Sequence, residues 1–194
     1  GSTDHADVTH EFALQWGTEV KGDSEGTGNG EFDHVVSVAA TPDGSVYVVD
    51  QQNHLIQKFT YDGVFISQWG SKGADDGQFN SPNDVAVGPG GSVYVSDGFN
   101  DRILKLTPDG EFVRKWGSYG TGNGKFEDPW GIAVALDGDV YVSDVENHRI
   151  QRCTSEGLFV NSWGSYGTDD GQFDAPYGVA VAPDGSVYVA DVNN

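Results

Sequence analysis

The chain has 194 residues, and its 30 acidic and 10 basic residues give a formal net charge of −20 at pH 7. This charge repels phosphate backbones and anionic bilayer surfaces, so nucleic acid and membranes are not expected as partners. The single cysteine, Cys153, excludes an intrachain disulfide and a thiolate-rich zinc site.

The N-terminal segment Glu11–Gly17, with the sequence EFALQWG, is the first predicted strand. A long glycine-rich and acidic loop follows it, from Thr18 to Phe32. The GTGNG run in this loop does not lie in the strand-to-helix context that a phosphate site requires. Nucleotide binding is therefore not expected.

From Phe32 onward the sequence repeats with a period of 47 residues. The triplet VYV starts at residues 46, 93, 140 and 187, and the same step separates Phe32, Phe79, Phe126 and Phe173. Trp-Gly pairs recur at Trp69, Trp116 and Trp163, whereas Trp16 lies six residues further upstream than the period requires. A fixed period of this length predicts a repeat architecture with an insertion in the first loop.

Each period predicts four short strands separated by turns. In the third copy the strands are 131–136, 139–144, 149–154 and 158–163, and sequences such as PDG, LDG and SEG supply the turns. The first two strands carry apolar residues at successive positions, which is typical of strands that are buried on both faces. Such units bury both faces when they are stacked around an axis, as in the blades of an all-β propeller.

The C-terminal segments 178–183 and 186–191 are the predicted inner strands of a fourth blade. We expect one domain, 1–194, with four four-stranded blades, in which the N-terminal strand 11–17 closes the last blade and hides its edge. The third strand of that blade would come from residues 1–8, which contain few apolar residues. A closed monomer is favoured, and the alternatives are a part of a larger ring or a ring completed by self-association.

Two stretches carry a resemblance to known families. The pattern F..P.GVAVAPDGSVYVADVNN from Phe173, with NHRIQ and F...WG elsewhere, resembles the NHL repeat, whose Asn-His-Leu occurs here at residues 53–55. The resemblance implies an NHL-type β-propeller and leaves the function open. RNA-binding members of the family imply a basic face, which this acidic chain does not provide.

The second copy, from Ser81, is also similar to a blade of the peptidylglycine amidating lyases. That resemblance implies metal-binding histidines just after the proline of the innermost strands. The matching positions hold Val36, Asn83, Trp130 and Tyr177, and Phe99 stands where the family has a tyrosine. The zinc site of the lyases is therefore not expected in this chain.

The polar residues that recur in every period are expected to have a structural role. Asp50, Asp97, Asp144 and Asp191 are equivalent, and each lies three residues before an Asn, where a carboxylate can accept backbone N–H bonds in a turn. His54, Asp101 and His148 are equivalent as well and are typical of a strand entry. The function of these residues is thus predicted to be architectural, although they share a face with the loops after the second and fourth strands.

The positions after the inner-strand prolines agree in place and differ in residue, which is typical of a ligand-binding surface at the mouth of a propeller. Trp130 and Tyr177 offer apolar faces with polar ends, and Asn83 with Asp84 offers hydrogen bonding. We therefore expect a non-catalytic module that binds a protein or a small polar ligand, without a cofactor, a catalytic residue or a metal ligand. The candidate contacts are Asn83, Asp84, Trp130, Tyr177, His54, Asp101, Arg102 and His148.

Two other hypotheses remain open. One is a metal-dependent lyase or lactone hydrolase, with a divalent cation such as Ca²⁺ held in the central channel or in the acidic loops. The other is an excised or engineered repeat fragment without activity, which the opening Gly1–Ser2 favours because it resembles a cloning remnant. The acidic composition fits adaptation to high salt, and an extracellular or cell-surface location agrees with this type of module; the sequence does not decide the compartment.

Overall fold

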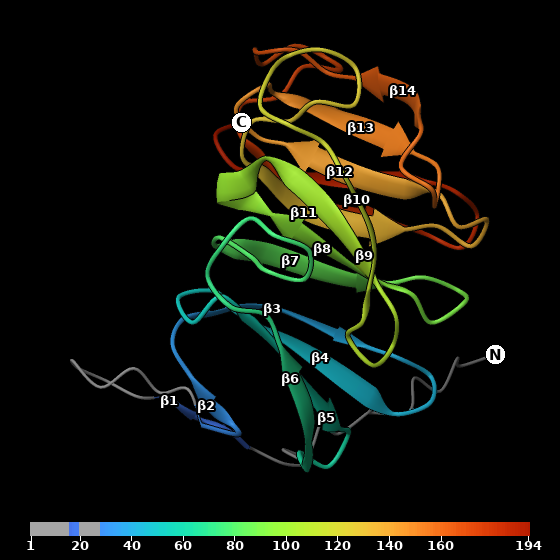
Figure 1. Ribbon diagram of the computed structural model, residues 1–194. Coiled ribbons are helices and arrows are strands. Elements are labelled where there is room, and N and C mark those ends of the chain that lie inside the picture. Colours follow the sequence, from blue (N-terminus) through green and yellow to red (C-terminus); the bar gives the residue numbers. More distant parts are fainter. Residues whose placement is uncertain (1–15, 20–27) are drawn as a thin grey trace, which may run out of the picture.

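The computed structural model describes residues 16–19 and 28–194, and short β-strands dominate this part of the chain. The sheets follow one another in chain order from the blue end to the orange end of Figure 1. Three antiparallel sheets have four strands each: β3 (Val35–Ala40), β4 (Ser45–Asp50), β5 (Leu55–Thr60) and β6 (Phe65–Trp69); β7 (Pro82–Val87), β8 (Val93–Asp97), β9 (Arg102–Leu106) and β10 (Phe112–Trp116); and β11 (Pro129–Val134), β12 (Val140–Asp144), β13 (Arg149–Cys153) and β14 (Phe159–Trp163). The predicted all-β, four-stranded repeat unit is confirmed.

The remaining strands form two smaller sheets. β15 (Pro176–Val181) pairs with β16 (Val187–Asp191), and β1 (Thr18–Glu19) pairs in parallel with β2 (Glu31–Phe32). A single 3₁₀ turn, η1 (Gly98–Asn100), is the one helical element among the described residues. No helix there is long and apolar enough to cross a bilayer.

The inner strands β11 and β15 begin earlier than the predicted starts at residues 131 and 178. In the third sheet β11 begins at Pro129, two residues before the predicted start at Gly131, and it ends at Val134. Pro129 lies opposite Asp144, and the register shifts by a bulge between Pro129 and Ile132. A proline is tolerated there because it is the first residue of the strand. Trp130 lies within this bulge, and bulges change the direction of the side chains inside them.

The apolar core lies between neighbouring sheets. Tyr47, Val49 and Ile56 of the first sheet pack in one cluster with Val85 and Leu104 of the second. The next cluster joins the second and third sheets in the same way, around the fully buried Phe126. The inner strands β3, β7, β11 and β15 pack side by side in that order. Each sheet therefore depends on its neighbour to bury its apolar faces, as the sequence predicted.

The fourth blade is described in part. Its inner strands, β15 and β16, form a two-stranded sheet among the described residues. The predicted closing strand 11–17 falls mostly outside the described residues, as does the segment 1–8. Trp16, which is described, packs against Phe59 of the first sheet with ring centroids 4.6 Å apart. The described sheets fit a β-propeller, and they do not fix the number of blades in a closed ring.

Candidate functional site

The positions that vary between repeats meet in one groove. Val36, Asn83, Trp130 and Tyr177 are each the second residue of an inner strand, and together they line a groove with a volume of about 230 Å³. Four of the eight predicted contact residues line this groove, namely Asn83, Asp84, Trp130 and Tyr177. The sequence did not single out the other lining residues, Ser37, Gly131 and Gly178.

An aromatic pair forms one side of the groove. The rings of Trp130 and Tyr177 are 4.8 Å apart between centroids and meet edge to face at 67°. Both side chains are only partly buried, so they keep surface for a ligand. Edge-to-face contact fixes the orientation of two aromatic rings and adds about 0.5–1.5 kcal/mol beyond their burial.

Two buried serines hold the backbone beneath this aromatic pair. The Ser143 hydroxyl donates to the Tyr177 carbonyl oxygen at 2.7 Å, and the Ser96 hydroxyl donates to that of Trp130. Gly131 permits the close approach of β11 and β15, because a Cβ at this position would clash with the Tyr177 carbonyl oxygen. These contacts depend on spatial neighbours and leave no signal in a single sequence.

Asn83 and Asp84 form the polar side of the groove, and most of their hydrogen-bonding groups are already engaged. The Asn83 amide accepts a hydrogen bond from Gln51 at 2.8 Å and donates to the carbonyl oxygen of Pro129 at 3.0 Å. The Asp84 carboxylate accepts from the Ile132 N–H at 2.8 Å and from the Ser37 hydroxyl. These residues therefore tie the inner strands together, and Asp84 adds a negative charge to the groove.

The stability of the chain should depend on pH through Asp84. Burial raises the pKa of Asp84 above its ordinary value of 3.8, against the opposing effect of its hydrogen bonds. The folded state then binds the proton more tightly than the unfolded state, so the contribution of Asp84 to the free energy of unfolding rises as pH falls through the raised pKa towards 3.8.

Urea unfolding of the wild type and Asp84→Asn at several pH values between about 7 and 4 tests this direction. We expect the wild type to gain stability relative to Asp84→Asn as pH falls. Asp84→Asn is the matched comparison because its amide keeps the shape of the side chain and does not titrate. A constant difference between the two proteins across this range would contradict the prediction.

The equivalent residues His54, Asp101 and His148 link neighbouring blades. All three have a left-handed backbone, with φ between 51° and 56°. The His54 Nδ1 atom accepts a hydrogen bond from the backbone N–H of Ser81 at 3.0 Å, and Asp101 and His148 accept from the equivalent N–H groups of Asp128 and Ala175. The predicted architectural role is confirmed for these three residues, and their role as ligand contacts stays a prediction.

The repeated aspartates are hydrogen-bonding centres of the turns, as predicted. Fully buried Asp97 accepts from the Asn80 backbone N–H at 2.6 Å and from the Asn100 side chain at 2.8 Å. The same backbone contact recurs at Asp50, Asp144 and Asp191. Arg102 completes this centre with its Nε 2.8 Å from Asp97, and it is nearly buried. Its position therefore separates it from the groove.

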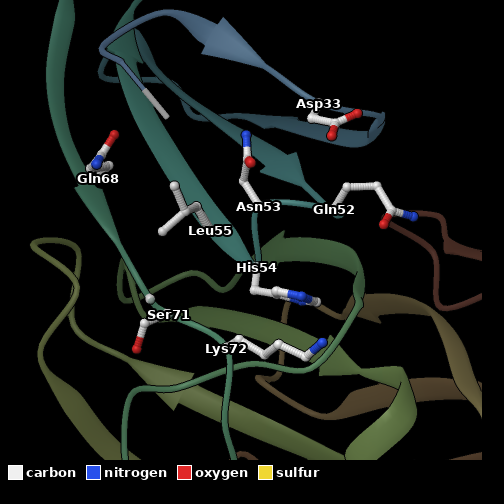
Figure 2. Close-up of a pocket in the computed structure, with 9 residues that line it drawn as sticks. Asp33, Gln52, Asn53, His54, Leu55, Gln68, Ser71 and Lys72 are labelled. Carbon is white, nitrogen blue, oxygen red and sulfur yellow. The ribbon is translucent and has the colours of Figure 1, made fainter. Parts of the chain in front are cut away.

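A second, more polar pocket of about 570 Å³ lies beside the first sheet. Its lining includes His54, Lys72 and Asp33, and Figure 2 shows the side chains of His54 and Lys72 extending in the same direction. Burial lowers the pKa of His54, and the nearby Lys72 charge lowers it as well, against the opposing effect of the Asp97 and Asp50 charges. Of the eight predicted contacts, only His54 lines this pocket.

Within the described ranges, no group of three or more His, Cys, Asp or Glu side chains is arranged to hold a metal ion. The groove contains all four positions that match the histidines implied by the resemblance to the amidating lyases. In this chain they are Val36, Asn83, Trp130 and Tyr177.

Comparisons with known proteins support the fold. The family model of the NHL repeat matches residues 79–106 and 126–153, which run from the blade connector through the first three strands of the second and third sheets. A streptogramin B lyase structure is 17% identical, with 82% of this chain and 49% of that chain covered, at a TM-score of 0.65. Virginiamycin B lyase from Staphylococcus aureus is 19% identical, with 81% and 49% covered, at a TM-score of 0.61.

Hydrazine synthase from Kuenenia stuttgartiensis is 18% identical, with 94% of this chain and 47% of that chain covered, at a TM-score of 0.64. The chain thus spans about half the length of these solved structures. The search of curated proteins found no match. Identities this low show a shared fold and pass no activity to this chain. Two segments of the chain thus match the NHL repeat, and the structural neighbours support the β-propeller type of fold.

Proposed function

We propose that this chain is a non-catalytic binding module whose inner-strand groove takes a cationic or polar segment of a protein, or a small ligand of the same chemistry. The observation that carries the proposal is the convergence of Val36, Asn83, Trp130 and Tyr177 on one groove. These positions are equivalent in the frame and differ in side chain. The frame engages the Asn83 amide, whereas Trp130 and Tyr177 keep partly exposed surface in the groove.

Charge and aromatic surface support a cationic ligand. The net charge of −20 raises the local concentration of cations around the molecule. Trp130 and Tyr177 line the groove as an edge-to-face pair, and a cation over a tryptophan ring gains about 0.5–2 kcal/mol. The partly buried Asp84 beside them adds negative potential to the same wall.

The fold also carries enzymes, since streptogramin B lyase and hydrazine synthase are among its neighbours. A metal-dependent lyase or lactone hydrolase is therefore the second hypothesis, and it rests on the likeness of the fold alone. Elemental analysis of the purified chain separates the two. A stoichiometric divalent cation that survives dialysis would favour the enzyme hypothesis.

Ligand-observed NMR with blocked tripeptides that have Lys, Arg, Asn or Glu at the centre tests the binding proposal. We expect saturation transfer to the Lys and Arg peptides, and Trp130→Ala should weaken their binding about fivefold, which corresponds to a loss of about 1 kcal/mol. Tyr61→Ala is the control, because Tyr61 is an exposed aromatic residue outside the groove. Equal transfer to the Glu peptide, or equal binding by Trp130→Ala, would contradict the proposal.

A further inference from the structure

The inner-strand groove has an aromatic half and an acidic half. Trp130 and Tyr177 form the aromatic half, and the residue that follows each of them in the chain is a glycine. The equivalent positions of the first two sheets hold Ser37 and Asp84, which form the acidic half. A ligand beside the ring pair therefore meets no further side chain from the two glycine positions, and it faces the Asp84 carboxylate across the groove.

The ring pair has the geometry of a corner. The planes of Trp130 and Tyr177 meet at 67°, with the ring centroids 4.8 Å apart. Two planes that meet at so large an angle enclose a space to which each ring presents one face. The face of an aromatic ring is electron-rich, so a cation in this space is attracted by both rings.

Most acceptors of the acidic half are already engaged within the protein. The Asp84 carboxylate accepts from the Ser37 hydroxyl and from the backbone N–H groups of Val85 and Ile132. These bonds use three of the roughly four acceptor sites of a carboxylate. The Asn83 amide oxygen accepts from the side chain of Gln51. Asp84 therefore attracts a cation by its charge and offers little capacity to accept hydrogen bonds from it.

The backbone beneath the ring pair is engaged in the same way. The carbonyl oxygens of Trp130 and Tyr177 each accept a hydrogen bond from a buried serine. An unmodified lysine ammonium has three N–H donors, and each donor that loses water without a new acceptor lowers the affinity. A trimethylated ammonium keeps the charge, has no N–H donor, and adds methyl groups that pack on aromatic rings. The groove therefore suits the methylated cation better than the unmodified one.

We propose that the groove recognises a methylated ammonium group, which lies in the corner between Trp130 and Tyr177 and faces Asp84. This inference rests on the proposed function, because it specifies the cation that the same groove takes. The groove volume of about 230 Å³ is below the range of about 300–1,000 Å³ of pockets for drug-sized ligands, and it suits a single head group. Such a group occurs on a modified lysine of a protein and in small molecules such as choline.

Titration of the chain with three forms of one blocked tripeptide, observed by NMR of the peptide, tests the proposal. The central residue is lysine, trimethyllysine, or the neutral analogue of trimethyllysine with carbon in place of the charged nitrogen. We expect trimethyllysine to bind about fivefold more tightly than lysine. The neutral analogue should bind more weakly than trimethyllysine, because it keeps the shape and loses the charge.

The outcomes separate this inference from the proposed function. Binding of the lysine peptide without a gain on methylation, or equal binding of the neutral analogue, would overturn the inference and leave the proposed function standing. Absence of binding by every cationic peptide would overturn both. A parallel titration with choline distinguishes the sources of the group: an affinity equal to that of the trimethyllysine peptide indicates a small molecule, and a weaker one indicates a modified protein side chain.

Substitutions at Trp130 separate the effect of the ring from that of its apolar bulk. Trp130→Phe keeps an aromatic face and should retain part of the preference for trimethyllysine over the neutral analogue. Trp130→Leu keeps apolar bulk alone and should bind the two peptides equally. Trp130 is partly exposed, so both variants should fold, which circular dichroism checks. Tyr61→Leu, at an exposed position outside the groove, is the matched control. Full preference in Trp130→Leu would contradict the proposal.

Discussion

Replacing Phe126 with alanine should lower the free energy of unfolding by about 3–5 kcal/mol, the usual cost of emptying a buried phenylalanine site. Phe126 is fully buried in the cluster that joins the second and third sheets. Its ring also packs against Gly117, where an added Cβ would lie 2.7 Å from a Phe126 ring atom. Urea denaturation monitored by tryptophan fluorescence measures the change.

Phe173→Ala is the matched control for this prediction. Phe173 holds the same repeat position before the β15–β16 sheet, and its ring is only partly buried. The same substitution should therefore cost clearly less there, because the removed ring atoms already contact water. Equal losses at the two positions would contradict the conclusion that the core lies between complete sheets.

Replacing Arg102 with leucine should cost about 3 kcal/mol, because removing one partner of a buried ion pair leaves the other charge uncompensated. The Arg102 guanidinium is 2.8 Å from the Asp97 carboxylate and also donates to the carbonyl oxygens of Ala74, Asp75 and Gln78. It therefore joins β9 to the connector that precedes its own sheet. Leucine is sterically acceptable at this position, since Leu55 is its equivalent in the first sheet.

Two comparisons isolate the charge from the packing. Arg149→Leu removes the equivalent ion pair with Asp144. The hydrogen bonds from Arg149 to its connector are more exposed, so this substitution should cost less than Arg102→Leu. Asp97→Asn in the Arg102→Leu background should recover part of the loss, because the amide carries no charge to bury. If the double substitution costs as much as the sum of the two single ones, the Arg102 and Asp97 side chains are not energetically coupled, which would contradict the prediction.

Much of the fold could be predicted because the same pattern of apolar and turn residues occurs four times in the sequence. The strands around Val140 and Arg149 lie within one residue of their predicted bounds. The inner strands start earlier because Pro129 pairs with Asp144 across a bulge, and a bulge depends on the partner strand rather than on local propensity. The exposure of Val38 and Tyr188 was not predicted, since their apolar character is the same as in the buried repeats.

The candidate site was predictable in position and less so in chemistry. The equivalence of Val36, Asn83, Trp130 and Tyr177 placed them together, because equivalent residues in neighbouring blades meet at the same end of the inner strands. The sequence could not show that Asn83 is engaged by Gln51 and Pro129, or that Arg102 is buried against connector carbonyls. Those contacts join segments that the sequence keeps apart.

We propose that the polar residues common to the repeats hold the frame and that the inner-strand residues that differ between repeats bind the ligand. The most direct test is one NMR titration of the Lys-centred tripeptide against folded Trp130→Ala and Asn100→Ala. Asn100 belongs to the frame, where its amide bonds Asp97 and the Gly73 carbonyl oxygen. Wild-type affinity in Asn100→Ala with a loss of about fivefold in Trp130→Ala is the predicted result. Weaker binding in Asn100→Ala with unchanged binding in Trp130→Ala would contradict the claim.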